Sequence, residues 1–363
     1  MSSLEPPASR DCFHVAIICA LPLEADAVAL LFDQFWDEDG DPYGHLDSDT
    51  NSYITGRIGS HDVVLAVLPG MGTTDAAVAT ASLRSSYPRL KLALLVGICG
   101  GVPKIDGYDA FLGDVVVSRS IVRYDYGRQY PGHFVAKDSV EDSLGRPNTE
   151  IRGLLAVFQT ELVRERLQEK AMVYLKQLQT TAIKKRRRTK YQNPGSAEDR
   201  LYSPNDAHRH QSSCERCLGG TLDFCEVAAK ASCRKLGCDE NKSKTRMDRI
   251  QEDDYRTQIY IGRVGSGNAV MKSGLDRDRV AAQHGLIGFE MEGAGAWDQV
   301  PCIVVKGVCD YADSHKDKQW QAFAAATAAS VAKAMLERYP AGDRVPVAPK
   351  CKKCFNPSSI KRF

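Results

Sequence analysis

The sequence predicts an α/β domain with a central mixed, largely parallel sheet flanked by helices and interrupted by a helical, Cys/His-rich insertion. Short apolar runs alternate with helical patterns through the first half of the chain, which is typical of a parallel sheet. The same alternation resumes near residue 258, after a segment of different character. Of the 363 residues, 43% are hydrophobic and 26% are charged, so a globular core is expected.

The first half of the chain supplies most of the expected sheet. A short apolar run bounded by turn residues is typical of a buried strand, whereas longer segments with apolar residues three and four apart are typical of helices. Strands are expected at 13–21, 61–70, 91–101 and 112–122, and helices at 23–35 and 74–87. The third of these strands ends in "GICGG".

The second half completes the domain after the insertion. Strands are expected at 258–267, in "GLIGFEMEG" and at 300–313, followed by an alanine-rich closing helix at 318–339. The insertion begins with a helical stretch, continues through "KKRRRTK" and then becomes polar and rich in Cys, His and Asp. The predicted boundaries are a disordered N-terminus at 1–10, one α/β domain from 11–150 and 258–339, an insertion at 151–257, and a tail at 340–363.

Charge and hydropathy exclude several classes of protein. The formal net charge is only +2, which argues against a dedicated nucleic-acid-binding face, and the basic run 184–188 is interpreted as a solvated helix end. Every long apolar run is interrupted well short of a membrane span, and the N-terminus carries no signal-peptide pattern. Several cysteines lie inside apolar runs, as expected of small hydrophobes in a reducing compartment. We therefore expect a cytoplasmic protein with neither a membrane nor a nucleic-acid partner.

Three acids and two glycine-rich turns fall at the ends of expected strands. Glu24, Glu292 and Asp310 follow such strands, and "PGMG" and "GICGG" end two others. Open α/β sheets bind ligands at the carboxyl ends of their strands, and glycine allows a ligand to approach the backbone. Other interpretations remain open, because Glu24 also suits a first helical turn and Asp310 also suits a turn cap. Neither a dinucleotide-binding nor a P-loop glycine pattern occurs.

A set of ordered motifs resembles the nucleoside phosphorylase/nucleosidase superfamily. The motifs are "CALPLEAD", "PGMG", "GICGG", "LGDVVVS", "GSGNAVMKS", "GFEMEGAG" and "KGVCDYAD", and the resemblance covers roughly 13–135 and 258–338. The arrangement is also similar to the phosphorylase-like domain at the N-terminus of fungal NLR-type proteins. The resemblance implies a phosphorylase-like single domain, a homo-oligomer, and neither an organic cofactor nor a catalytic metal.

The resemblance also implies roles for individual residues. Asp310 would share a proton with purine N7, Glu292 would accept hydrogen bonds from the ribose hydroxyls, and Glu290 would support it. Met291 would pack against the sugar, Met71 would lie below it in its turn, and Trp320 would lie near the ribose 5′ side. The base pocket would be lined by Cys99, Gly100, Val270 and Met271. The complete set of expected substrate-binding residues is Met71, Gly72, Ile98, Cys99, Gly100, Val270, Met271, Met291, Lys306 and Trp320.

The residue type at Glu24 distinguishes two possible reactions, hydrolysis and phosphorolysis. Phosphorylases of the family carry an arginine in the matching turn, whereas a carboxylate repels phosphate and can deprotonate water. The other two phosphate-binding positions of the family are Leu95 and Ile98 here, although Lys306 and Arg57 remain as possible anion ligands. We therefore expect hydrolysis of purine nucleosides to free base and ribose. Phosphorolysis, and a module that senses a nucleoside or nucleotide in an NLR-like system, remain the alternatives.

Two further features bear on specificity and on metal binding. Asn268 stands where hydrolases of thioether nucleosides carry an aspartate, so the preferred purine nucleoside or nucleotide stays open. In the insertion, "HRHQSSCERC" and the cysteines downstream predict a tetrahedral zinc site that would stabilise a loop-rich segment. The candidate ligands are His210, Cys214, Cys217 and Cys238. The alternative is a set of free thiols and surface histidines.

Overall fold

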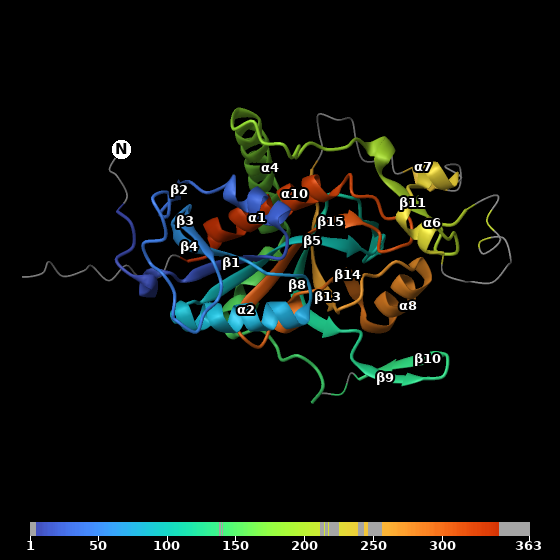
Figure 1. Cartoon of the computed structure of the whole chain (residues 1–363), viewed down its shortest axis with the longest axis horizontal. Helices are drawn as coiled ribbons and strands as arrows, with labels where there is room; N and C mark the ends of the chain where they lie inside the picture. The colour runs from blue at the N-terminus through green and yellow to red at the C-terminus, as the bar shows by residue number, and fades with distance from the viewer. Residues whose placement is uncertain are drawn as a thin grey trace, which may run out of the picture.

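The computed structural model places a nine-stranded mixed sheet at the centre of the protein, as the sequence predicts (Figure 1). The structure describes residues 5–137, 139, 141–210, 214, 217, 225–238, 243–245 and 256–340. Residues 1–4 of the expected disordered N-terminus and residues 341–363 of the expected tail lie outside the described residues. The strand order is β14-β13-β8-β15-β5-β1-β4-β3-β2.

The middle of this sheet consists of parallel strands that are buried on both faces. They are β15 (Cys302–Asp310), β5 (Leu92–Gly101), β1 (Val15–Cys19) and β4 (His61–Val67). All five residues of β1 are buried, in keeping with its uninterrupted apolar sequence "VAIIC". The antiparallel strands β3 (Tyr53–Ile58) and β2 (Gln34–Phe35) extend the sheet at one edge.

On the other side of β15 the sheet curls round, so that its last strand returns to pair with β5. Strands β8 (Val115–Arg123), β13 (Ile259–Ser266) and β14 (Leu286–Glu290) follow β15 in the sheet order, and β14 also pairs antiparallel with β5. This extra pairing sets Gly288 opposite Gly101 and Phe289 opposite Gly100. The motifs "GICGG" and "GFEMEG", far apart in sequence, are therefore neighbours.

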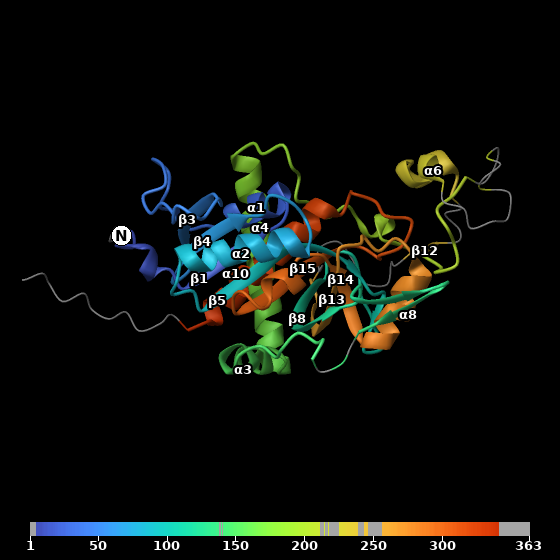
Figure 2. The ribbon, with the colours of Figure 1, turned by 60° about the horizontal axis from the view of Figure 1, so that its bottom comes forward.

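Helices cover the sheet on two sides (Figures 1 and 2). Helix α10 (Gln321–Arg338) is buried from Phe323 to Leu336 and packs against the sheet, α1 (Pro22–Ala29) and α4 (Glu161–Lys184). The close approach of α10 to β15 requires Gly307, because a Cβ there would lie 2.0 Å from the carbonyl oxygen of Ala324. On the other side, α2 (Thr73–Ser86) packs against the short helix α9 (Gly293–Ala296).

The remaining elements are mostly peripheral, and some differ from expectation. The helix predicted over 23–35 ends at Ala29, and β2 follows it, so the last residues of that segment join the sheet edge. Strand β3 was not among the predicted strands. The other elements are η1 (Arg10–Cys12), β6 (Lys104–Ile105), β7 (Tyr108–Asp109), β9 (Gly127–Tyr130), β10 (His133–Ala136), α3 (Thr149–Phe158), η2 (Ser196–Glu198), β11 (Arg200–Tyr202), α6 (Glu226–Lys230), α7 (Cys233–Leu236), β12 (Ser243–Thr245) and α8 (Gly274–His284).

The segment expected as an insertion has two structurally different parts. Its helices α3 and α4 contribute Phe158, Leu167 and Leu178 to the same hydrophobic core as the sheet. The basic run 184–188 begins at the end of α4 and is exposed throughout. Later in the segment, a separate small cluster consists of Cys217, Ala228, Leu236 and Cys238. Among the described residues, no helix is long and apolar enough to cross a membrane.

Candidate active site

A cavity of about 790 Å³ lies at the carboxyl ends of β1, β5, β14 and β15. This is the edge at which α/β sheets bind ligands. Ten of the residues expected at the site line it: Glu24, Met71, Ile98, Cys99, Gly100, Val270, Met271, Met291, Glu292 and Asp310. Residues of the insertion, among them Lys230 and Ser232, form part of its wall.

Glu24 lies in the first turn of α1 and is 2% exposed. Its Oε2 accepts hydrogen bonds from the backbone N–H groups of Ala20 and Leu21, both at 2.9 Å, and its Oε1 accepts one from Ile98 at 2.8 Å. Burial raises the pKa of this carboxyl, and the nearby charge of Lys306 opposes the rise. The side chain is thus held firmly at the cavity wall with an increased affinity for a proton.

Gly97 is the residue that leaves room for this carboxylate. A Cβ on Gly97 would lie 2.2 Å from Oε1 of Glu24. The first glycine of "GICGG" therefore accommodates the acid of "PLEAD", which lies more than seventy positions earlier.

Lys306 and Glu292 form a buried ion pair beside Glu24. The Nζ of Lys306 donates to Oε2 of Glu292 at 2.8 Å, and the two side chains are 2% and 7% exposed. Burial acts against the charge of Lys306, but the carboxylates of Glu292, Glu24 and Glu290 outweigh it and raise the pKa of the ammonium group. Lys306 thus serves as the common counter-charge of three buried acids, and it is committed to Glu292 rather than directed at a free anion.

Glu290 supports the turn that presents Glu292. Its carboxylate accepts hydrogen bonds from the backbone N–H of Glu292 at 3.0 Å and from that of Gly293 at 2.9 Å. These N–H groups begin α9, so the acid satisfies donors at a helix start. Burial, and then the charge of Glu292, raises the pKa of Glu290.

Asp310 is the last residue of β15, the neighbour of β5 in the sheet, and it lines the cavity. Its Oδ1 accepts a hydrogen bond from the backbone N–H of Ala312 at 2.8 Å and lies 3.1 Å from the Nζ of Lys316. Lys316 also lines the cavity. Sequence reasoning missed this lysine, and its only signal is its place in the polar loop after "KGVCDYAD".

Two aromatic residues in the cavity were also missed. Tyr124 and Phe289 meet edge to face, with ring centroids 5.4 Å apart and planes at 85°. The hydroxyl of Tyr124 donates to the carbonyl oxygen of Ala269 at 2.8 Å. Flat apolar surfaces of this kind suit a heteroaromatic base. Phe289 stands inside the quoted "GFEMEG" motif, but Tyr124 lies in a polar stretch with no distinguishing pattern.

Asn268 connects two loops at the cavity mouth. Its Oδ1 accepts hydrogen bonds from the backbone N–H and the hydroxyl of Thr73, both at 3.0 Å, and its own N–H donates to Asp125. An aspartate at this position would accept the same bonds, so the substitution keeps the acceptor. Gly72, an expected site residue, belongs to this connection with φ of 116° and is not part of the cavity lining.

Trp320 and Arg57 do not line the cavity that contains Glu24. Trp320 is 3% exposed, its indole N–H donates to the carbonyl oxygen of Glu198, and it lines a neighbouring cavity of about 550 Å³. Trp320 is therefore absent from the lining of the cavity that contains Glu24, but its own cavity shares Asp310 and Lys316 with that one. Arg57 lies in β3, next to the edge strand β2, and pairs with Asp62 at 3.3 Å. Leu95 is 1% exposed in the core.

The expected zinc ligands divide between two groups. His210, Cys214 and Cys217 gather with Cys225, whereas Cys238 gathers with His208, Cys233 and His315. Cys238 is therefore not part of the set predicted for it. His315, which comes from outside the insertion, could not have been found from the spacing of cysteines alone.

The fold and the cavity together define a class of protein. Residues 14–339 match the family model described as the phosphorylase superfamily, and the chain belongs to that family. The resemblance inferred from the motifs is thereby confirmed.

Particular relatives refine this placement. A nucleotide-binding leucine-rich repeat (NLR)-like protein of Hyaloscypha variabilis is 30% identical over 341 residues, which cover 91% of this chain and 30% of that protein. The chain thus spans less than a third of the length of this curated relative.

Solved structures share the fold at lower identity. A 5′-methylthioadenosine/S-adenosylhomocysteine nucleosidase from Neisseria meningitidis matches with a TM-score of 0.50 and 15% identity, over 89% of this chain and 98% of that one. The futalosine hydrolase of Helicobacter pylori matches with a TM-score of 0.51 and 14% identity, over 90% and 98%.

Proposed function

We propose that the protein hydrolyses the N-glycosidic bond of a purine nucleoside or nucleotide. The observation that carries this proposal is the buried carboxylate of Glu24 at the cavity wall, where phosphorolysis would require a cation. An anion at that place repels phosphate and accepts a proton from water.

Three acids have different roles in the proposed reaction. Glu24 takes a proton from water, and the oxygen of that water forms a bond to C1′ as the bond between C1′ and the base breaks. Asp310 donates a proton to the purine at N7, so that the electron pair of the breaking bond leaves with a neutral base. Glu292, oriented by Lys306, accepts hydrogen bonds from the ribose hydroxyls and favours the positive charge that develops on the sugar.

The raised pKa of Glu24 suits the role of a base. A carboxyl whose pKa is raised by burial binds a proton from water more readily than an exposed one. Tyr124 and Phe289 supply the aromatic surface for the base, and Met291 lines the same cavity.

Features at the cavity mouth support two further parts of the proposal. Lys272 and Lys318 line the cavity, and their charges would suit a nucleotide phosphate.

Met71 and Val270 line the cavity too but are 53% and 49% exposed, so we propose that a second copy of the chain covers them in a homo-oligomer. None of the ten described cysteines forms a disulfide bond, which supports a cytoplasmic location.

A sensing role is the second candidate, and the NLR-like relative favours it. In that case the cavity would bind a nucleoside or nucleotide and signal without turnover.

One experiment separates the candidates. Purified protein is incubated with adenosine, guanosine, inosine, 5′-methylthioadenosine or ATP, with and without phosphate, and base, ribose and ribose 1-phosphate products are quantified. Base release that does not depend on phosphate is expected. Strict dependence on phosphate would identify a phosphorylase, and tight binding of one of these compounds without turnover would favour the sensing module.

A further inference from the structure

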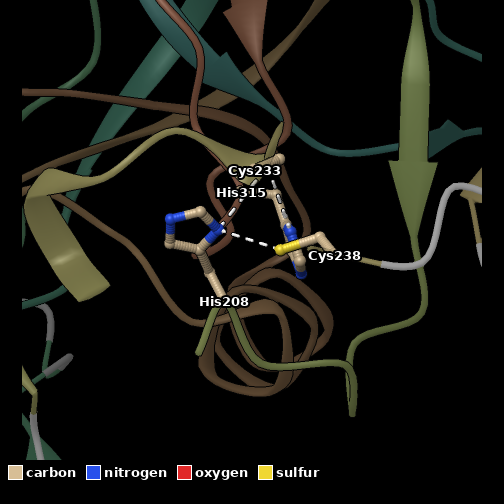
Figure 3. A group of neighbouring side chains, drawn as sticks. All are labelled: His208, Cys233, Cys238 and His315. Atoms are coloured by element: carbon tan, nitrogen blue, oxygen red, sulfur yellow. Dashed lines mark hydrogen bonds between the residues drawn. The ribbon is translucent and has the colours of Figure 1, made fainter. Parts of the chain in front are cut away.

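Two groups of four Cys and His side chains lie outside the proposed reaction, and all but His315 belong to the later part of the insertion. The first group is His208, Cys233, Cys238 and His315, and Figure 3 shows their side chains directed toward one another. The second is His210, Cys214, Cys217 and Cys225. Within each group, one nitrogen or sulfur atom per residue lies within 4.8 Å of all the others.

Distances in the first group match the edges of a metal-centred tetrahedron. The Nδ1 of His208 lies 3.5 Å from the Sγ of Cys233 and 3.5 Å from that of Cys238, and the Nδ1 of His315 lies 3.6 Å from the Sγ of Cys233. Tetrahedral zinc with bonds of about 2.3 Å to sulfur and about 2.05 Å to nitrogen separates N from S by about 3.5 Å.

Both histidines of this group are oriented by backbone carbonyl groups. The Nε2 of His208 lies 2.8 Å from the carbonyl oxygen of Ala231, and the Nε2 of His315 lies 3.0 Å from that of Asp206. A carbonyl oxygen only accepts, so each Nε2 carries the proton and each Nδ1 directs its lone pair at the thiols. This is the arrangement in which proteins hold metal-binding histidines.

The second group also brings four possible nitrogen and sulfur ligands together, with three cysteines and one histidine instead of two of each. The Nδ1 of His210 lies 3.3 Å from the Sγ of Cys217 and 3.8 Å from that of Cys225. Cys214 and Cys217 are separated by two residues, a spacing common to structural zinc sites. The second group is nested in sequence between the first and second ligands of the first group.

The described residues around these groups form a small apolar cluster. Its buried members, among the residues that the structure describes, are Cys217, Ala228, Leu236 and Cys238, and two of these four are candidate ligands. A segment with so small a core typically requires a metal or disulfides to fold.

We propose that each group binds one Zn²⁺ ion as a structural site. The first would use two thiolates and two neutral imidazoles, and the second would use three thiolates and one. Each thiol loses its proton to solvent as its sulfur–zinc bond forms, so binding releases protons and strengthens as pH rises. All four coordination positions are filled by protein, which leaves none for water and excludes a catalytic zinc.

The first site ties the insertion to the loop that follows Asp310. His315 lies in this loop, next to Lys316, whose Nζ is 3.1 Å from Oδ1 of Asp310. Cys233 and its neighbour Ser232 line the cavity. Zinc at this site therefore fixes a cavity wall and the position of Lys316, whereas the second site stabilises only the distal part of the insertion.

Metal content of the full-length protein tests the proposal. The chain is expressed in zinc-supplemented medium, purified under reducing conditions without chelator, and its Zn, Fe, Ni and Cu contents are measured by mass spectrometry. Two equivalents of zinc per chain are expected. Cys238→Ser and Cys217→Ser should each lose one equivalent, and the double variant should lose both. Cys12→Ser, which changes an exposed cysteine far from either group, should keep both.

Cobalt exchange provides a second measurement, whose result on the wild-type protein does not depend on the folding of variants. Co²⁺ bound at the two sites should give the d–d absorption of tetrahedral coordination, with thiolate charge-transfer bands whose intensity falls by about two fifths in Cys238→Ser, which loses a site with two of five thiolates. Zinc-free protein with all thiols reactive, a Cys233–Cys238 disulfide, or iron in place of zinc would overturn the proposal.

Discussion

Oε1 of Glu24 occupies the space that a side chain at Gly97 would need: a Cβ there would lie 2.2 Å from it. The glycine motif of β5 and the acid of α1 therefore depend on each other. Because Gly97 has no side chain, there is space for the carboxylate of Glu24. Glu24 is further held by backbone N–H groups of Ala20, Leu21 and Ile98.

Gly97→Ala should displace the Glu24 carboxylate and abolish most base release. We expect a fall in kcat of about 10²-fold or more, because the water-activating base would leave its position. The double variant Gly97→Ala/Glu24→Ala should be no slower than Glu24→Ala, since both changes remove one function. If the two effects multiplied, the role assigned to Gly97 would be wrong; circular dichroism and thermal unfolding would verify that each variant is folded.

The pH dependence of catalysis should report Glu24. Burial raises the pKa of its carboxyl above the ordinary value of 4.5, and only the ionised form takes a proton from water. The value of kcat/KM should therefore decrease as pH falls through this raised pKa. In Glu24→Gln, which retains one acceptor oxygen, the residual activity should lack that acidic limb. An unchanged limb would mean that another group controls it.

Lys306→Met should destabilise the protein strongly. It leaves Glu292, Glu24 and Glu290 buried without their common counter-charge, a situation that typically costs about 3–5 kcal/mol. Adding Glu292→Gln should restore part of the free energy of unfolding, because one uncompensated charge is removed. Urea unfolding of the single and double variants measures this coupling. Additive losses would contradict it.

Glu290→Gln should alter how stability depends on pH. Burial and the charge of Glu292 raise the pKa of Glu290 in the folded state, so the folded protein binds more protons than the unfolded one between about 4.5 and that raised pKa. Stability contributed by this group is therefore lost as pH rises through the window. The wild type should lose stability relative to Glu290→Gln as pH rises, measured by urea unfolding at several pH values. A difference that is constant with pH would show that Glu290 does not titrate there.

How much of this site could be predicted depended on whether its contacts were local or long-range. The strand-end position of Glu24, Glu292 and Asp310 follows from alternating apolar runs, because parallel strands bring their carboxyl ends to one edge. The partners of these acids do not follow from such a pattern. The Lys306–Glu292 pair requires two strands to be placed in space, and Lys316 reaches Asp310 only through the turn at Ala312.

The Cys/His segment illustrates the same limit. The sequence shows enough ligands for zinc, but grouping them requires knowledge of the chain path. His208 and His210 lie two positions apart yet belong to different groups, and His315 joins the first group from a loop of the core domain. Trp320 is a related case: its indole donates to the carbonyl oxygen of Glu198 in the insertion, a long-range contact that the sequence does not indicate.

Asp310→Asn should separate proton donation from structure. An asparagine retains an oxygen that accepts the hydrogen bond from Ala312, so the turn after β15 and the fold should persist. The amide supplies no acidic proton to the leaving base, and kcat should fall by about 10²–10⁴-fold. Lys316→Met serves as the matched variant, since it removes the charge beside Asp310 while keeping the carboxyl, and it should have a smaller effect on kcat. Substrates with a base that leaves readily without protonation, such as p-nitrophenyl riboside, should be cleaved by Asp310→Asn at close to the wild-type rate. An equal loss on both kinds of substrate would contradict protonation by Asp310 and would indicate that it acts in binding alone.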